Sequence, residues 1–152
     1  MLKQETNKVM KWEVPGTPAG GLRKVGQIRA TNSLIFRTGQ NGMTVALELL
    51  STHIPGAPVV DDRDEFVGFI SEFDVLRALE AGKDLSELKA DDIMTHGRIA
   101  VTADTTIEQA VKTMEGQRLL NLPVKTNGKV TSSVTRHDLL RAWIGIGVGI
   151  EE

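Results

Sequence analysis

Hydrophobic and polar positions follow the same order in two parts of the chain. In the first part a short apolar run, residues 33–37, predicts a strand. Apolar residues then recur at helical spacing behind Asn41, which predicts a helix with Asn41 as N-cap and with Pro55 and Gly56 at its end. The buried stripe of this helix is predicted to consist of Met43, Leu47, Leu50 and Ile54.

The next stretch predicts two strands and a helix. Apolar runs at residues 57–61 and 65–71 surround the polar turn 61–64, as in a hairpin or two neighbouring strands with a tight connection. A second helix is expected to stop near Gly82. Its apolar residues are Val75, Leu76 and Leu79.

The second part repeats this order. We expect a strand at residues 98–101, a helix capped by Thr105 or Thr106 that ends near Gly116, and a hairpin around Asn127-Gly128. The buried residues of the two helices in this part are predicted to be Ile107, Ala110, Val111 and Met114, followed by Leu139, Leu140, Trp143 and Ile144. Between the two parts, residues 84–94 predict one linking helix capped by Asp84.

The two parts also share residues at fixed offsets. A shift of 65 places Pro58 on Pro123, and a shift of 64 places Asp74 on Asp138. We therefore predict an α/β (α+β) fold of two β-α-β-β-α repeats that are related by a pseudo-twofold axis and pack on each other. The expected domains are a flexible arm (1–23), a first repeat (24–83), the linking helix (84–94), a second repeat (95–144) and a Gly-rich tail (145–152).

Composition narrows the class of protein. The 18 basic and 20 acidic residues give a net charge of −2, which indicates no whole-chain attraction to nucleic acid or to an anionic membrane. Cysteine is absent, so disulfide and thiolate chemistry are excluded. We find neither a signal peptide nor an apolar run long enough for a membrane span, and we expect a cytoplasmic protein.

Residues suited to catalysis are sparse. The three histidines, His53, His96 and His137, lie at unrelated places in the repeat without metal-ligand spacing. No serine stands in a nucleophile motif, and the glycines after residue 144 follow a helix where a dinucleotide loop would follow a strand. We therefore expect no enzyme, no metal site and no required cofactor.

One polar pattern is kept by both repeats. A hydroxyl and a carboxylate stand three residues apart where the last strand turns into a helix, as Ser71 with Asp74 and as Thr135 with Asp138. The spacing fits a helix cap of the capping-box type. It also fits a carboxylate that accepts hydrogen bonds from the two vicinal hydroxyls of a ribose, beside a helix N-terminus that favours phosphate. Spacing alone leaves both interpretations open.

The ordered set of motifs resembles a tandem pair of CBS domains, also called a Bateman module. The resemblance covers residues from about 24 to 144 and rests on GAPVVDDRDEFVGFISEFDVLRAL in the first repeat and on DDIMT, LPV and TRHDLLRA in the second. It implies a non-catalytic regulatory module that binds AMP, ADP, ATP, NAD or S-adenosylmethionine in the cleft between the repeats. It also implies a disc-shaped homodimer and an effector protein that receives the signal; a ligand-free dimerisation or docking module is the alternative.

The resemblance assigns roles to residues. The ribose is expected at Ser71, Asp74, Thr135 and Asp138. The adenine pocket is expected at Gly56, Ala57 and Pro58, and at Asn121, Leu122 and Pro123. Many family members carry a basic residue two or three positions before this proline, and it is missing here. Any phosphate would therefore be met by Arg37, Arg118, Arg136 or His137, or by the partner subunit. If one site alone is filled, we expect Ser71 and Asp74 to hold it.

Overall fold

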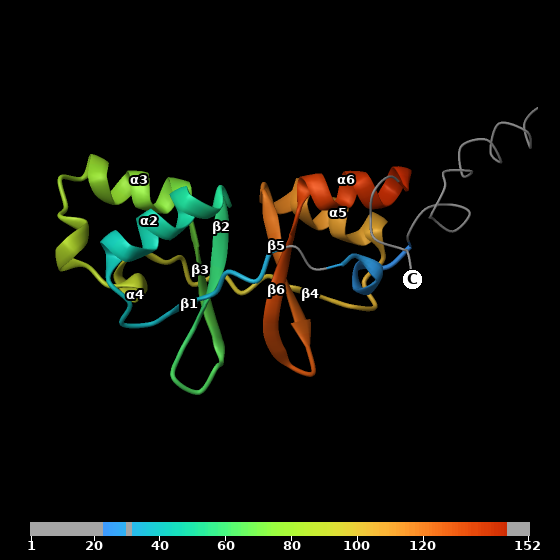
Figure 1. Ribbon diagram of the computed structural model, residues 1–152, viewed down its shortest axis with the longest axis horizontal. Coiled ribbons are helices and arrows are strands. Elements are labelled where there is room, and N and C mark those ends of the chain that lie inside the picture. The colour runs from blue at the N-terminus through green and yellow to red at the C-terminus, as the bar shows by residue number, and fades with distance from the viewer. Residues whose placement is uncertain (1–22, 30–31, 146–152) are drawn as a thin grey trace, which may run out of the picture. The chain divides into compact units, whose positions relative to one another are not determined.

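The computed structural model describes residues 23–29 and 32–145. It is a mixed α+β structure with two three-stranded sheets, in the orders β1-β2-β3 and β4-β5-β6 (Figure 1). Each repeat follows the predicted order of strand, helix, strand, strand and helix, and its three strands form one sheet. The fold class predicted from the repeat is therefore confirmed.

The first repeat has one parallel and one antiparallel strand pair. Its elements are β1 (Phe36–Arg37), α2 (Gly42–Thr52), β2 (Gly56–Val60), β3 (Phe66–Ser71) and α3 (Glu72–Glu80). β1 runs parallel to β2, with Phe36 opposite Val59, whereas β2 and β3 form the antiparallel hairpin. The hairpin register places Gly56 opposite Ser71. The predicted strand 33–37 is thus shortened to the two residues that pair with β2.

The second repeat has the same elements. They are β4 (Val101–Thr102), α5 (Ile107–Gln117), β5 (Asn121–Thr126), β6 (Lys129–Thr135) and α6 (Arg136–Ile144). Thr106 is the cap of α5. Asn127 and Gly128 have φ of 53° and 81°, as a two-residue hairpin turn of the predicted kind requires. The strand expected at 98–101 is reduced to β4.

The single helix predicted over residues 84–94 is wrong. The segment consists of a short 3-10 helix, η2 (Leu85–Glu87), and a one-turn helix, α4 (Ala90–Ile93), because Leu88 and Lys89 between them have extended backbones. Asp84 caps the first turn as expected, since its side chain accepts from the N–H of Ser86. The extended residues let the segment bond to the first repeat: Leu88 accepts from the N–H of Gly42, and the N–H of Ala90 donates to Gln40.

The described residues divide into two compact units. One holds residues 32–100 and 123–133, and the other holds 23–29, 101–122 and 134–145. In the second unit a 3-10 helix, η1 (Val25–Gln27), bonds to the loop before α5, where the N–H groups of Val25 and Gly26 donate to Thr105 and Ala103. The arm predicted at 1–23 and the tail predicted at 145–152 lie, except for Arg23 and Gly145, outside the described residues.

The prediction of which side of α2 is buried is wrong. The side chains of Val45 and Leu49 are buried, whereas Met43, Leu47 and Leu50 are 40%, 56% and 66% exposed. The helix carries apolar residues on two sides, and only the side that meets the sheet enters the core. That core consists of Phe36, Val45, Leu49, Ala57, Val59, Ile70, Val75, Leu85, Ala90 and Ile93.

The other outer helices show the same division. In α3, Val75 is buried while Leu76 and Leu79 are exposed, and in α6 Leu139 is buried while Leu140 is exposed. Trp143 and Ile144 are exposed as well, so part of the predicted core of the last helix lies at the surface. The buried side of α5 agrees with the prediction at Ile107, Ala110 and Met114, and Val111 is half-buried.

Candidate functional site

The first candidate site lies where β3 turns into α3. Ser71 is the last residue of β3 and the N-cap of α3, with an extended backbone at φ −108° and ψ 168°. Its hydroxyl accepts from the N–H of Asp74 at 3.2 Å, while its own N–H donates to Oδ2 of Asp74 at 2.8 Å. The two residues thus form a capping box, which satisfies N–H groups that a helix start leaves without partners.

The carboxylate of Asp74 has little acceptor capacity to spare. The residue is 7% exposed, and besides the Ser71 N–H its Oδ2 accepts from the Ser71 hydroxyl at 3.1 Å. Its Oδ1 accepts from Nη2 of Arg77 at 2.7 Å. Sequence reasoning missed this role of Arg77, although arginine stands three residues after aspartate in both repeats.

Gly56, Ala57 and Pro58 lie beside this pair on β2. Gly56 is directly opposite Ser71, and the N–H of Glu72 donates to the carbonyl of Pro55 at 2.9 Å, which ties the start of α3 to the start of β2. A Cβ on Gly56 would lie 2.6 Å from the Phe69 ring. The structure therefore brings four predicted residues of the first site to one hairpin: Gly56, Ala57, Pro58 and Ser71. It adds the half-buried ring of Phe69, which no sequence motif indicates.

The second junction repeats the first. Thr135 caps α6, its hydroxyl accepts from the N–H of Asp138 at 3.1 Å, and its N–H donates to Asp138 Oδ2 at 2.9 Å. The N–H of Arg136 donates to the carbonyl of Leu120 just before β5, as Glu72 does to Pro55 in the first repeat. On β5, Asn121, Leu122 and Pro123 are buried.

A third capping box shows that this geometry serves helices in general. Thr106 and Gln109 at the start of α5 exchange the same two hydrogen bonds, both at 3.0 Å. This box does not follow a hairpin strand, and its side-chain acceptor is a neutral amide. The feature that distinguishes the two junctions is therefore a buried carboxylate at the end of a hairpin, and not the cap alone.

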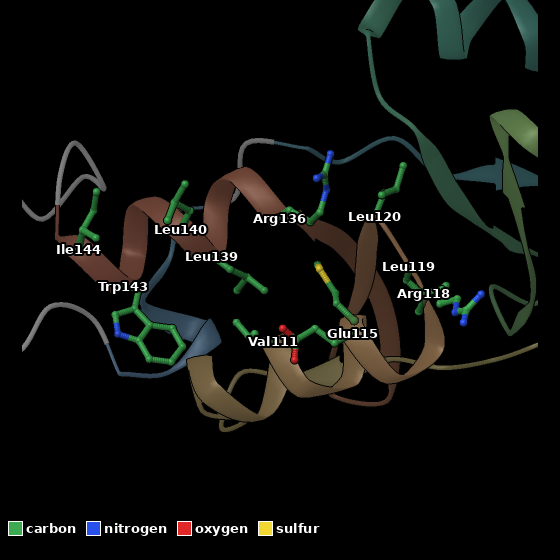
Figure 2. Close-up of a pocket in the computed structure, with 11 residues that line it drawn as sticks. Val111, Glu115, Arg118, Leu119, Leu120, Arg136, Leu139, Leu140, Trp143 and Ile144 are labelled. Carbon is green, nitrogen blue, oxygen red and sulfur yellow. The ribbon is translucent and has the colours of Figure 1, made fainter.

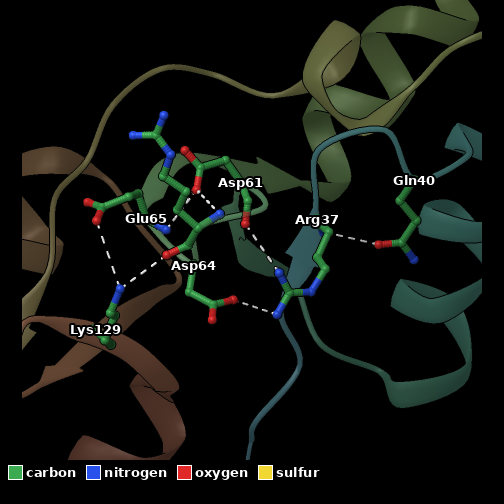
Figure 3. Close-up of polar contacts among 7 residues, drawn as sticks. Arg37, Gln40, Asp61, Asp64, Glu65 and Lys129 are labelled. Carbon is green, nitrogen blue, oxygen red and sulfur yellow. Dashed lines mark hydrogen bonds and ion pairs between the residues drawn. The ribbon is translucent and has the colours of Figure 1, made fainter.

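Arg37 does not join the first junction. It pairs with Val60, at the opposite end of β2 from Gly56, so the length of that strand separates it from Ser71. Its guanidinium donates to the carbonyl of Asp61 and to Oδ1 of Asp64 at 2.6 Å, as Figure 3 shows. The structure therefore does not place Arg37 beside Ser71, where the phosphate contact was expected.

The hairpin turn near Arg37 has its own electrostatics. Hydrogen bonds from the backbone N–H groups of Glu65 and Arg63 hold the pKa of Asp61 below its ordinary value. Both N–H groups donate to Oδ1 at 2.9 Å. Lys129 from the second hairpin adds an ion pair to Glu65 at 3.8 Å and a hydrogen bond to the carbonyl of Arg63 (Figure 3).

Two of the other expected phosphate residues line a groove between α5 and α6. The groove has a volume of about 640 Å³, with Arg118 and Arg136 toward one end and Trp143 and Ile144 toward the other (Figure 2). Apolar residues between these ends also line it: Val111, Met114, Leu119, Leu139 and Leu140. His137 is exposed in the first turn of α6 and does not line the groove.

Residues 23–29 and 32–145 contain no group of three or more His, Cys, Asp or Glu side chains placed to hold a metal ion. In the same residues, no helix is both long and apolar enough to cross a membrane.

The chain is similar to proteins of several organisms. An uncharacterized protein of Methanopyrus kandleri is 30% identical over 130 residues, which are 84% of this chain and 66% of that protein. An uncharacterized protein of Methanocaldococcus jannaschii is 30% identical over 92 residues, which are 60% of this chain and 32% of that protein. The chain thus spans between one third and two thirds of the length of these relatives.

Solved structures share the fold. A CBS-domain containing protein of Agrobacterium tumefaciens superposes with a TM-score of 0.71 at 20% identity, over 81% of this chain and 95% of that one. The CBS domain pair of protein MJ0100, in complex with methylthioadenosine and S-adenosyl-L-methionine, gives 0.68 at 25% identity over 78% and 97%. CBSX2 in complex with AMP gives 0.65 at 24% identity over 78% and 94%.

The family assignment rests on both repeats. The family model described as CBS domain matches residues 25–81 and again residues 90–145, and the β-α-β-β-α order of each match is the order found in the structure. The chain therefore belongs to the CBS domain family, as a tandem pair of CBS domains.

Proposed function

We propose that this chain is a non-catalytic regulatory module that binds an adenosine-containing ligand at its two strand-to-helix junctions. The observation that carries the proposal is the buried carboxylate at the end of each hairpin, Asp74 in repeat 24–83 and Asp138 in repeat 95–144. Two solved structures of similar fold support the ligand class, because one is a complex with AMP and the other a complex with methylthioadenosine and S-adenosyl-L-methionine.

The proposed ribose contact uses chemistry already present at the junction. An ionised carboxylate has about four acceptor positions, and three at Asp74 are occupied by Ser71 and Arg77. The Ser71 hydroxyl can rotate away, which leaves two positions for the vicinal hydroxyls of a ribose. The same contact is proposed for Thr135 and Asp138.

The base is proposed to lie against β2 in the first site and against β5 in the second. At β2 the absence of a side chain on Gly56 leaves its backbone beside the ring of Phe69, a suitable surface for an aromatic base. Ala57 and Pro58 continue this wall. At β5 the corresponding residues are Asn121, Leu122 and Pro123.

Phosphate groups are proposed to meet the start of α6. Arg136 and His137 occupy its first turn, where the helix dipole favours an anion, and Arg118 lines the same groove as Arg136. The first residue of α3 is instead Glu72, which disfavours phosphate beside Ser71. A charged nucleotide is therefore expected at the second junction, and an uncharged or singly charged adenosine derivative at the first.

Binding is proposed to act on a homodimer and through it on an effector protein. A ligand changes the geometry of such an assembly only if its affinity differs between two states. The large apolar side chains exposed on α2, α3 and α6 support self-association, because monomers seldom expose such residues in groups.

The rival function is a ligand-free dimerisation or docking module. The box of Thr106 and Gln109 favours it, because it has the same geometry without a carboxylate and shows that capping alone explains the hydrogen bonds. Calorimetry of the full chain with AMP, ATP, NAD and S-adenosylmethionine separates the two functions. We expect binding heat from at least one of these ligands. We also expect mass spectrometry to identify the same compound after its release from the purified protein. If none of the four ligands binds, the ligand-free module is supported instead.

A further inference from the structure

The groove between α5 and α6 exposes large apolar side chains along its length. Leu140, Trp143 and Ile144 line it from α6 and are 60%, 39% and 45% exposed. Leu120 lines the opposite end and is 43% exposed (Figure 2). A hollowed apolar surface of this kind marks an interaction site.

Two cations stand at one end of this groove. Arg118 and Arg136 lie there, whereas Trp143 and Ile144 lie at the other end (Figure 2). Neither arginine forms an ion pair with Glu115, the acidic residue that lines the groove, or with any other carboxylate in the described part of the chain. An occupant that suits the groove is therefore apolar along most of its length and acidic where it meets the arginines.

The sequence directly after α6 has this pattern. Gly145 ends α6 in a left-handed conformation, with φ of 79°, right after Ile144 at the apolar end of the groove. Residues 146–152, IGVGIEE, then alternate apolar residues with glycines before two glutamates. In an extended backbone the apolar side chains of this segment lie on one side, and its glycines let the backbone come close to a neighbouring surface.

Segment 146–152 is also long enough to reach the arginines. Between Arg136 and Ile144 the axis of α6 covers about 12 Å, at the usual rise per residue of an α-helix. Six residues in extended conformation cover about 20 Å. The two glutamates can therefore reach the basic end of the groove after the chain has reversed its direction at Gly145.

From these observations we infer that segment 146–152 folds back along the groove between α5 and α6 of the same chain. Its apolar side chains cover the exposed wall of the groove, and its two glutamates pair with Arg118 and Arg136. The groove and the start of the segment belong to one compact unit, so the contact forms within that unit. Residues 1–22 suit the basic end less well, because they carry three lysines and two glutamates.

The covalent link favours this occupant over a separate molecule. A short tether gives the segment an effective concentration in the millimolar range, so weak contacts are enough to hold it. Its glycines increase the conformational entropy that is lost on docking. We therefore expect docked and open molecules to coexist.

A spin label measures the contact directly, because the chain contains no cysteine of its own. We would attach the label to the full-chain variant Gly149→Cys and compare amide NMR spectra before and after reduction of the label. Docking brings the label close to the basic end of the groove, so the amide signals of Arg118, Leu119 and Arg136 are expected to lose most of their intensity before reduction. Unchanged intensities would overturn the inference.

Two controls use the same label. Serine in place of Ile146, Val148 and Ile150 keeps the length and charge of the segment but removes its apolar side chains, and the lost signals should return. If they stay lost, the apolar contact is contradicted. In the second control, spin-labelled chains are mixed with isotope-labelled chains that carry no spin label. Signal loss in the latter would show that a second copy holds the segment, which would also overturn the inference.

The charge pairing has its own test. Glu151→Lys with Glu152→Lys, in the spin-labelled chain, should reduce the signal loss at Arg118 and Arg136, because the lysines face like charges. High salt should reduce the loss in the unchanged segment, since exposed ion pairs are screened. A signal loss that neither change reduces would contradict the assignment of the two glutamates to the arginines.

Docking also has a consequence for ligand binding, which rests on the proposed function. Arg118 and Arg136 are the residues offered there to phosphate, so a docked segment competes with a charged nucleotide. If half of the molecules are docked, a chain that stops at Gly145 should bind AMP about twofold more tightly in calorimetry than the full chain does. Equal AMP affinity would contradict the competition. If neither chain binds AMP, the phosphate contact of the proposed function fails, whereas the spin label still decides whether the segment docks.

Discussion

Asp74 accepts hydrogen bonds from both the backbone N–H and the hydroxyl of Ser71, at 2.8 and 3.1 Å. This relationship gives one carboxylate a structural role in the cap of α3 and, on the proposed function, a ligand role. The two roles are separable because they affect different measurements.

Replacing Asp74 by alanine is expected to affect stability and binding together. The loss of the cap acceptor, which leaves the Ser71 N–H without its partner, lowers the free energy of unfolding by about 1–2 kcal/mol. The loss of the ribose hydrogen bonds should lower the affinity for the adenosyl ligand, measured by calorimetry, at least about tenfold. Gln109→Ala is the matched control: it also removes a capping box and should cost about 1 kcal/mol without changing the affinity. Equal affinity in all three proteins would show that Asp74 does not hold the ligand.

The two junctions are expected to differ in occupancy. The second strand pair carries Lys125 and Ser132 where the first carries Val60 and Gly68, so its surroundings are more polar. For an adenosine derivative without a charged phosphate, Asp74→Ala should therefore reduce the bound ligand more than Asp138→Ala does. Equilibrium dialysis of each variant measures the stoichiometry, and ligand kept in Asp74→Ala but lost in Asp138→Ala would reverse the ranking.

Gly56→Ala is expected to destabilise the first unit. The added methyl group would lie 2.6 Å from the Phe69 ring and 2.9 Å from the Ile70 carbonyl, so the strand or the ring must shift, at a cost of about 1–3 kcal/mol. Gly116→Ala is the control, because nothing lies within 4 Å of its Cβ and alanine is the better helix former. Urea unfolding should show a lower midpoint for the first variant and an equal or higher midpoint for the second.

Asn41→Ala tests the junction between α2 and the segment after α3. The Asn41 side chain accepts from the N–H groups of Met43 and Thr44, and its Nδ2 donates to the Ser86 carbonyl at 3.0 Å. We expect a loss of about 1–2 kcal/mol in thermal or urea unfolding. Asn41→Asp keeps the cap acceptor but loses the donor to Ser86, so a smaller loss is expected. A loss as large as that of alanine would show that the Ser86 bond dominates.

The turn of the first hairpin is expected to weaken in acid. The hydrogen bonds from Glu65 and Arg63 lower the pKa of Asp61 from its ordinary value of 3.8. A carboxyl group whose pKa is lower in the folded state stabilises the fold above its unfolded pKa, and this contribution is lost as the pH falls through the folded pKa. A model aspartate titrates at about pH 4. Carboxyl-carbon NMR should give Asp61 a titration midpoint below that value. In melting curves below that pH, Asp61→Asn should show a smaller pH dependence than the unchanged chain.

The repeat made most of the local structure predictable. Thr106 as a cap, the Asn127-Gly128 turn and the hairpin that ends at Ser71 follow from short-range preferences of residue type and spacing, and the structure has all three. The linking segment was not predictable in this way. The extended backbones of Leu88 and Lys89 let the Leu88 carbonyl accept from the N–H of Gly42 and the N–H of Ala90 donate to the carbonyl of Gln40. Those partners lie more than 40 residues away in the chain, so no local pattern predicts them.

The candidate site likewise has features that the sequence predicts and features that depend on the tertiary structure. The pairs of Ser71 with Asp74 and Thr135 with Asp138 were visible as spacing, because a capping box is a local motif. The position of Gly56 opposite Ser71, the contact of Phe69 and the placement of Arg37 at the other end of β2 required the strand register. Register joins residues that the sequence leaves far apart.

By itself the sequence determined the order of strands and helices, the duplication and the two capped junctions, because each depends on contacts within a few residues. The tertiary structure alone decided which apolar side of α2, α3 and α6 is buried. Leu47 and Leu49 are the same residue type in one helix, yet Leu49 packs in the core while Leu47 lies 56% exposed. Burial depends on which side of the helix meets the sheet, and that is fixed by packing between distant elements.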